Sequence, residues 1–481
     1  MQMTSVPPRS GAKRPVNVGN LTEWDASEVK ADDIKGENHM SAFTDFVLNT
    51  KPQDLPDHVR ARTADYLLDL IAVAAGAVDM PASRIIREST ARMYGPGTGG
   101  NAHMLFDARK VSVAGAALAT ATQIDALDAH DGYSPSKGHA GCGLIGALLA
   151  EVDEMEDLAG DEFLTTLAIG YEVACRAAVS LHETACDYHT SGAWVAIACA
   201  AMSVRLKGGS PETLRQAIGI AEYHGPRSQM MREIDNPTML HDGSGWGAMT
   251  GVVSADMAMG GFLGAPAITV EAGEVAHHWN DLGTRWLVME QNIKLFPICR
   301  WVHAPIGAAL KLRSEHDIQS ADIERIEIHA FHNSTRLSHS MPKGIAEAQY
   351  SLCYPVACAL KLGRVGPSEI TGALFDDAEI SRLVGVTDVS ECDHCNANFP
   401  ADRLGRVVLH LKDGRSFDSG ISQAPGEASA PISRAGLIEK FHSYADPVLG
   451  NDRATKIRTS VFDLQQGGAL GDVLRKLRAP A

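Results

Sequence analysis

The sequence lacks the features that point to a membrane protein or a secreted one. Its apolar runs, such as AWVAIACAAMSV, end after about a dozen residues, whereas a membrane-spanning helix needs roughly 20. The first residues, MQMTSVPPRSGAKRPVNVG, contain no apolar segment of the kind that secretory signals carry. We therefore expect no membrane partner, and we expect the cytoplasm as the compartment.

Positive charge is also scarce. The chain has 43 Lys and Arg residues against 59 Asp and Glu residues, which gives a formal net charge of −16. A nucleic-acid-binding surface needs a basic patch, so we expect no nucleic-acid partner. An acidic substrate is not excluded, because a local cationic pocket can lie inside an acidic protein.

Several common catalytic signatures are missing. We find no GxSxG nucleophile motif, no dinucleotide-binding fingerprint and no HExxH motif. The nine cysteines show no regular spacing, which indicates reduced thiols rather than a disulfide framework. The segment ECDHC contains Cys392, His394 and Cys395. A zinc protein is therefore an alternative interpretation, although one CxxC pair alone is a weak zinc signature and we expect no metal site.

The patterns that are present predict a mainly α protein with two domains, because 481 residues are too many for one core. Residues 1–40 are polar and predict a tail or an arm. Residues 41–285 show helical spacing of apolar residues and predict a large all-helical domain, which residues 430–481 complete. Residues 286–429 include the alternating segment IERIEIHAF and the strand-turn-strand pattern RVVLHLKDGRSFDSGI, which predict a smaller α+β lid domain.

The segment DAHDGYSPSKGHAG carries the strongest indication of chemistry. It places Asp128, His130, Lys137 and His139 between two alanine-rich apolar segments. Desolvating such groups is costly unless they are paired or used. His139 could move a proton, and Lys137 with the start of the next helix could hold a carboxylate. The alternative is a solvated loop with a histidine cap.

Three further segments carry weaker indications. In DYHTSGAW, His189 lies among small residues at the start of an apolar segment, where a core histidine is the alternative. In PTMLHDGSGWGAMTG, His241 and Asp242 precede a Gly-rich helix start that could approach an anion. In IKLFPICRWVHAP, Lys294 and Arg300 suggest carboxylate binding. Two side chains that reach from a domain edge to solvent are the alternative there.

Taken together, the order and spacing of these segments resemble the MmgE/PrpD family. This family includes 2-methylcitrate dehydratase, cis-aconitate decarboxylase and iminodisuccinate epimerase. The resemblance runs from about residue 41 to about residue 460 and rests on the ordered set of segments. The positions that match family active-site positions are Asp128, His139, His189, Lys294 and Tyr354, the last from AQYSLCYPVA.

The chain departs from the family pattern at two places. The usual Asp-Asp-Thr after the first aspartate reads His130, Asp131 and Gly132 here, so a hydroxyl is missing. His241 stands where a family lysine is expected, before DGSGWGAM. The resemblance implies an all-α domain with an α+β lid, a homodimer and no cofactor, while the departures leave the substrate open.

By resemblance, the substrate would be a di- or tricarboxylic acid that loses a proton next to a carboxylate. His139 or His189 would be base or acid, and Asp128 would set tautomer and orientation. The remaining groups would bind carboxylates or donate a hydrogen bond, namely Lys294, Arg300, Lys137, His130, His241 and Tyr354.

Three reactions share this apparatus: loss of water, loss of CO2 and reprotonation on the other face. We expect a lyase of the dehydratase kind, because that activity is frequent in the family. A decarboxylase of the cis-aconitate type and an epimerase of the iminodisuccinate type are the alternatives on the same scaffold. A binding or scaffold member without turnover is the alternative from a different class.

Overall fold

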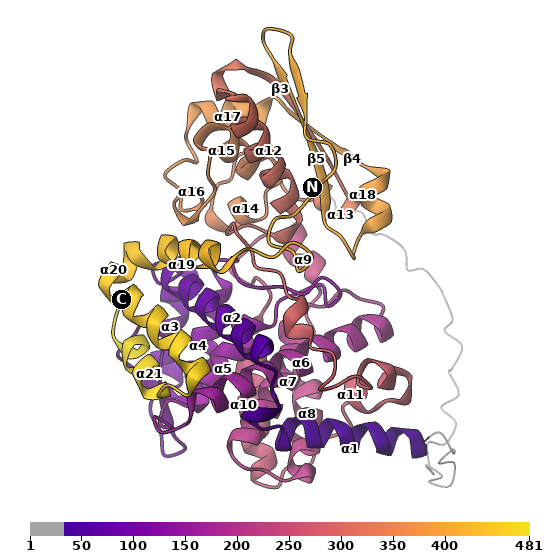
Figure 1. Cartoon of the computed structure of the whole chain (residues 1–481), viewed down its shortest axis with the longest axis vertical. Coiled ribbons are helices and arrows are strands. Elements are labelled where there is room, and N and C mark those ends of the chain that lie inside the picture. Colours follow the sequence, from indigo (N-terminus) through magenta and orange to yellow (C-terminus); the bar gives the residue numbers. More distant parts are fainter. Residues whose placement is uncertain (1–32) are drawn as a thin grey trace, which may run out of the picture.

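The larger domain is helical, as the sequence predicts, and the smaller domain lies above it (Figure 1). The computed structural model describes residues 33–481, with side chains from residue 39. Most of the predicted tail or arm, residues 1–32, lies outside the described residues. The rest of it belongs to the first helix, α1 (Asp33–Asn49). The other helices of this domain before the linker are α2 (Asp57–Gly76), α3 (Pro81–Met93), α4 (Val113–Asp125), α5 (Gly141–Glu151), α6 (Gly160–Thr184), α7 (Gly192–Leu206), α8 (Pro211–His224), α9 (Met230–Asp235), α10 (Ser244–Met259) and α11 (Ile268–Glu271).

Small side chains bring the central helices α4, α5, α7 and α10 into close contact. A Cβ added to Gly146 of α5 would lie 2.6 Å from the Cβ of Ala121 on α4, and one added to Gly251 of α10 would lie 2.4 Å from the Cβ of Cys199 on α7. Larger side chains would force these helices apart. The Ala- and Gly-rich composition therefore sets the spacing of the helices that carry the loop at residues 126–140.

Helix α6 is long and apolar enough to cross a membrane, although no uninterrupted apolar run in the sequence predicts one. Its 18-residue window has a mean hydropathy of 1.2, and 94% of that window is buried inside the protein. The helix also carries Glu172 and Arg176, which form a buried ion pair of 3.2 Å. Helix α6 is thus a core helix of the larger domain.

The C-terminal helices pack on the larger domain, and they are the yellow helices at its side in Figure 1. They are α19 (Arg434–Leu449), α20 (Asn451–Asp463) and α21 (Leu470–Arg478). Helix α19 packs on α2, where the buried Lys440 Nζ donates to Asp69 Oδ1 at 2.6 Å and to the carbonyl of Ala129 at 2.8 Å. Helix α19 thereby supports the polar loop that follows α4.

The smaller domain is built on a five-stranded sheet with the order β4-β3-β5-β6, in which β7 also pairs with β5. The strands are β3 (Ile323–Ala330), β4 (Thr387–Glu391), β5 (Leu404–Leu411), β6 (Ser416–Asp418) and β7 (Ser422–Gln423). The predicted hairpin is present, with Gly414 at φ +87° in its turn. The helices of this domain are α12 (His303–His316), α13 (His332–Thr335), α14 (Ile345–Gln349), α15 (Cys353–Leu362), α16 (Pro367–Ile370), α17 (Ala378–Gly385) and α18 (Asp393–Asn398).

The structure differs from the sequence interpretation at two points of domain organisation. The larger domain is not wholly helical, because a short antiparallel hairpin, β1 (Asn101–His103) with β2 (Lys110–Ser112), packs beside α4 and α5. The smaller domain also begins later than residue 286, since the 3-10 turn Leu287–Glu290 still packs on α2 and α6. A linker then runs to α12, and it carries Asn292 and Lys294 past the polar loop.

We expect the Lys440→Met variant to unfold more easily than the wild type. The substitution leaves the Asp69 carboxylate buried without its cation, which costs about 3–5 kcal/mol. Equilibrium urea unfolding would measure the loss. The matched control is Lys456→Met, which breaks the exposed pair with Asp452 and changes stability by less than about 1 kcal/mol. Equal losses in the two variants would contradict the importance of the buried pair.

Candidate active site

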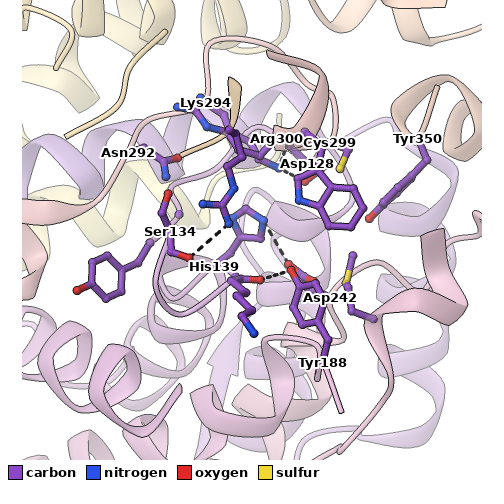
Figure 2. A pocket seen from close by; sticks show the side chains of 17 residues that line it. Asp128, Ser134, His139, Tyr188, Asp242, Asn292, Lys294, Cys299, Arg300 and Tyr350 are labelled. Carbon is purple, nitrogen blue, oxygen red and sulfur yellow. Dashed lines mark hydrogen bonds and ion pairs between the residues drawn. The ribbon is translucent and has the colours of Figure 1, made fainter. Parts of the chain in front are cut away.

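A cavity lies between the two domains and contains about 470 Å³ of empty space, its open mouth included. The loop after α4, the loop before α10, the linker and the smaller domain all contribute to its wall (Figure 2). The side chains that line the cavity include Asp128, Ser134, Lys137, His139, Tyr188, Asp242, Asn292, Lys294, Arg300, Tyr350 and Arg403.

The loop at residues 126–140 is held in shape by its backbone. Asp128 and Lys137 adopt left-handed conformations, with φ +50° and φ +56°, which non-glycine residues seldom adopt and which often mark functional sites. Gly132 and Asn292 exchange backbone hydrogen bonds of 3.1 and 2.7 Å, so the linker lies against the loop. A Cβ on Gly132 would lie 3.1 Å from His139 Nδ1, so glycine allows this close approach.

Lys294 and Asp128 form a buried ion pair at the cavity wall. Lys294 Nζ donates to Asp128 Oδ1 and, at 3.1 Å, to the Asp128 carbonyl. The lysine is fully buried, and Asp128 Oδ2 has no hydrogen-bond partner among residues 39–481. A bare carboxylate oxygen beside a buried ammonium can accept a hydrogen bond from a substrate.

His139 faces Asp242 across the cavity floor (Figure 2). Its Nδ1 donates to the carbonyl of Asp131, because a carbonyl can only accept. The lone pair of Nε2 therefore points to Asp242 Oδ2, 3.4 Å away. Burial, followed by the charge of Lys294, lowers the pKa of His139 well below its usual value. The imidazole is thus neutral and can accept a proton.

Asp242 is the acid partner of this pair. Burial, together with the carboxylates of Asp125 and Asp128, raises the pKa of Asp242 to about 7. Ser191 ties the two groups together, since it accepts from the His139 backbone N–H at 2.9 Å and donates to Asp242 Oδ2 at 3.1 Å. Near neutral pH, the pair offers one basic nitrogen and one carboxyl that can donate a proton.

Two of the cations at the cavity have no carboxylate partner within ion-pair distance in the described part of the chain, Lys137 and Arg403. Arg403 comes from the smaller domain, is buried, and donates to the carbonyls of Pro400 at 2.9 Å and Ser134 at 3.4 Å. Arg300, by contrast, is paired with Glu427 at 2.6 Å. An unpaired buried cation such as Arg403 is costly, and Lys137 is a half-buried cation beside it at the same cavity, so both suit an anionic ligand.

The structure brings five of the nine residues predicted from the sequence to the cavity: Asp128, Lys137, His139, Lys294 and Arg300. The other four lie elsewhere, each for a local reason.

His130 is fully buried behind His139, and its Nε2 lies 3.2 Å from Asp125 Oδ1. Tyr354 is buried in α15 and donates to the carbonyl of Glu369 at 2.6 Å. His189 is buried beside Tyr188, with its backbone N–H donating to His182 Nε2 at 3.2 Å.

His241 lines two neighbouring cavities on the other side of the loop that carries Asp242. Its backbone adopts φ +48°, so that consecutive side chains of this loop reach opposite sides of one wall.

Sequence reasoning did not select Asp242, Arg403 and Tyr350 as site residues. The segment that contains Asp242 was identified from the sequence, but its neighbour His241 was chosen as the site residue. Tyr350 lies four residues before Tyr354 in the same segment, and its hydroxyl points toward the cavity (Figure 2). Arg403 had no local signal, since it lies in a polar turn before β5.

The described residues also show where a metal could and could not bind. Cys392 Sγ accepts the backbone N–H of Cys395 at 3.4 Å and so caps α18, which gives the ECDHC segment a structural role. Two clusters at the site could offer three ligand atoms each, Asp128 with His130 and His139, and Asp125 with His130 and Cys142. Both require His130, whose ring nitrogens already face protein acceptors.

Comparison with known proteins adds the family context. The model of the MmgE/PrpD N-terminal domain matches residues 41–277, and that of the MmgE/PrpD C-terminal domain matches residues 296–466. A cis-aconitate decarboxylase-like protein, oryM of Aspergillus oryzae, is 23% identical, covering 91% of this chain and 96% of its own. A cis-aconitate decarboxylase of Aspergillus terreus is 22% identical, covering 90% of this chain and 94% of its own.

We expect the Asp242→Asn substitution to be more favourable for stability at about pH 8 than at about pH 5. The pKa of Asp242 is about 7 in the folded protein against an ordinary value of 3.8, so the folded state loses stability as pH rises through this window. The variant has no such loss. The melting temperature of the variant minus that of the wild type should therefore be higher by about 2–5 °C at about pH 8 than at about pH 5. Thermal unfolding at both pH values measures this difference.

The control is Asp418→Asn. The hydrogen bond from Arg406 lowers the pKa of Asp418 to about 2, so this carboxyl is ionised in the folded and the unfolded state throughout the window. Its melting-temperature difference from wild type should therefore not change with pH. An Asp242→Asn difference that is equally flat would show that the Asp242 carboxyl is ionised at neutral pH.

Proposed function

Because the chain belongs to the MmgE/PrpD family, we propose that it is a lyase that moves a proton next to a carboxylate of a di- or tricarboxylic acid. The observation that carries this proposal is the pair of His139 and Asp242, 3.4 Å apart, inside a cavity lined by cations. A base, an acid and cationic groups are what proton transfer beside a carboxylate requires.

Substrate binding would rest on the unpaired cations. Arg403 and Lys137 approach the cavity from the smaller and the larger domain respectively, so a substrate with two or more carboxylates could bridge the domains. Arginine suits a planar carboxylate because it can donate two parallel hydrogen bonds. This favours a polycarboxylate over a monocarboxylate.

The proton transfer would use the neutral imidazole of His139. In a dehydration, His139 Nε2 would accept the proton from the substrate carbon while the Asp242 carboxyl protonates the departing hydroxyl, which leaves as water. In a decarboxylation, the C–C bond to the leaving carboxylate would break, CO2 would depart, and the Asp242 carboxyl would protonate the carbon that receives the electron pair. Lys294 would stabilise the negative charge that develops on the neighbouring carboxylate, as buried cations do in enolate-forming enzymes. Its pairing with Asp128 keeps the ammonium in place before the substrate arrives.

Two elimination reactions, decarboxylation and dehydration, are compatible with this base, acid and set of cations. We place decarboxylation of a cis-aconitate-like acid first, because relatives described as cis-aconitate decarboxylases match about nine tenths of this chain. Dehydration of a hydroxy tricarboxylate, the reaction expected from the sequence, comes second. It is favoured by the adjacent base and acid, since loss of water needs both groups at once.

We expect proton NMR in D2O to identify the reaction. The protein would be incubated with cis-aconitate, citrate, 2-methylcitrate and iminodisuccinate. A terminal vinylidene signal with release of CO2 means decarboxylation, and a new vinyl signal without CO2 means dehydration. Loss of an α-proton signal alone means epimerisation. No change with any acid, from a folded protein, would overturn the proposal and favour a binding or scaffold role.

With an active substrate, His139→Gln and Asp242→Asn should each lower kcat by at least about 100-fold, since general acid-base groups contribute 10²–10⁴. His103→Asn is the matched control, because His103 pairs with Asp153 at 3.0 Å outside the cavity. Full activity in both site variants would exclude this pair from the chemistry.

Arg403→Gln should raise KM by about tenfold or more with a smaller effect on kcat, because it removes a charge-assisted contact to a substrate carboxylate. Steady-state kinetics would measure both constants. Arg406→Gln, three residues further along and paired with the exposed Asp418, is the control and should leave KM unchanged. An unchanged KM in Arg403→Gln would remove this residue from substrate binding.

A further inference from the structure

A second imidazole lies directly behind His139, on the side away from the cavity. The rings of His130 and His139 meet edge to face, with their centroids 4.6 Å apart. His130 is fully buried and does not line the cavity. It therefore has no route to a substrate, and the substrate-binding role expected from the sequence does not suit its position.

The hydrogen-bond partners of His130 show its charge. Its Nε2 lies 3.2 Å from Asp125 Oδ1, and its Nδ1 lies 3.4 Å from the carbonyl of Asp131. Both partners are acceptors, and a neutral imidazole has only one N–H to donate. An imidazolium satisfies both contacts. The carbonyl of Asp131 also accepts from His139 Nδ1, so one carbonyl joins the two rings.

The charges around His130 support the same protonation state. Two neighbouring buried ammonium groups each have one carboxylate partner, Lys294 with Asp128 and Lys440 with Asp69. The nearby carboxylate of Asp125 faces His130 in the same way, at 3.2 Å. Among the described residues, Asp125 Oδ2 accepts only the backbone N–H of Ser244, at 3.3 Å, so without His130 its charge would be buried without an ion-pair partner. The titratable groups that interact with His130 are Asp69, Asp125, Asp128, Asp131, His139, Cys142, Asp242 and Lys294. One group further away, His241 interacts with Asp125, and Lys440 interacts with Asp69.

We propose that His130, held as a cation by Asp125, is a positioning residue that keeps the His139 imidazole uncharged and directed at Asp242. The proposal deepens the proposed function, because it names a group that prepares the base before substrate binds. A second positive charge on His139 would lie beside the fully buried His130 imidazolium, where solvent screens charge poorly. Repulsion between the two rings therefore disfavours protonation of His139.

Two consequences follow for the base. His139 keeps its proton on Nδ1, where the Asp131 carbonyl accepts it, and its Nε2 stays free at a pH where an ordinary histidine would be partly charged. The direction of the His139 pKa agrees, since burial lowers it first, and the charges of Lys294 and His130 lower it further. His130 thus acts through His139 and not on the substrate.

The test is NMR of the protein labelled in its histidine rings, titrated from about pH 5 to about pH 8 without substrate. The spectra of His130→Asn and His139→Gln assign the two rings. We expect His130 in the wild type to show the imidazolium signature across the range, while His139 stays neutral with the proton on Nδ1. A neutral His130 in the wild type at about pH 6 would overturn the proposal without any variant.

Substitutions give a second test of the same proposal. His130→Asn removes the imidazolium charge next to His139, so the His139 ring should begin to titrate between about pH 5 and about pH 8. Asp125→Asn should do the same, because His130 then loses the partner that holds its proton. His103→Asn removes a histidine–aspartate pair outside the site and should leave the His139 titration unchanged. A folded His130→Asn protein with the wild-type His139 titration would contradict the proposal.

Kinetics separates this inference from the function on which it rests. With an active substrate, the acid limb of kcat/KM should move to higher pH in His130→Asn, so that the loss of activity is larger at about pH 6 than at about pH 8. A purely structural role would lower activity equally at both. If the wild type turns over no acid, the proposed function fails, while the NMR titration still decides the role of His130.

Discussion

The buried ion pair between Lys294 and Asp128 is the contact on which the site depends. Two charges taken out of water must meet each other, or the fold pays a large desolvation penalty. This pair joins the linker to the loop after α4 and fixes the unusual backbone of Asp128 at the same point. The backbone exchange between Gly132 and Asn292 extends the same junction. These contacts hold His139, on the loop, and Lys294, on the linker, in fixed positions relative to each other.

The fold could be predicted from the sequence because its signals are local. Apolar residues at helical spacing predicted the larger domain, and the alternation in IERIEIHAF predicted the strand that is β3. Ser210 followed by Pro211 is likewise typical of a helix start, and in α8 the Ser210 hydroxyl accepts the backbone N–H of Thr213. The importance of the polar loop was also predictable, since the ionisable groups Asp128, His130, Lys137 and His139 lie between apolar segments and need partners or a function.

The direction of individual side chains was not predictable in the same way. Tyr350 and Tyr354 lie four residues apart, yet one lines the cavity and the other bonds to a carbonyl in the smaller domain. His241 and Asp242 likewise reach different cavities. Arg403 meets the loop only through the packing of two domains, so no pattern near it in the sequence could reveal its role.

Lys440 makes the position of the loop depend on a distant part of the chain. The ammonium that donates to the Ala129 carbonyl belongs to α19, 311 residues later in the sequence. Until α19 packs on α2, Asp69 and the Ala129 carbonyl must remain solvated, so the loop at residues 126–140 lacks this support. During synthesis, most helices of the larger domain therefore emerge before the residue that completes the packing of this loop.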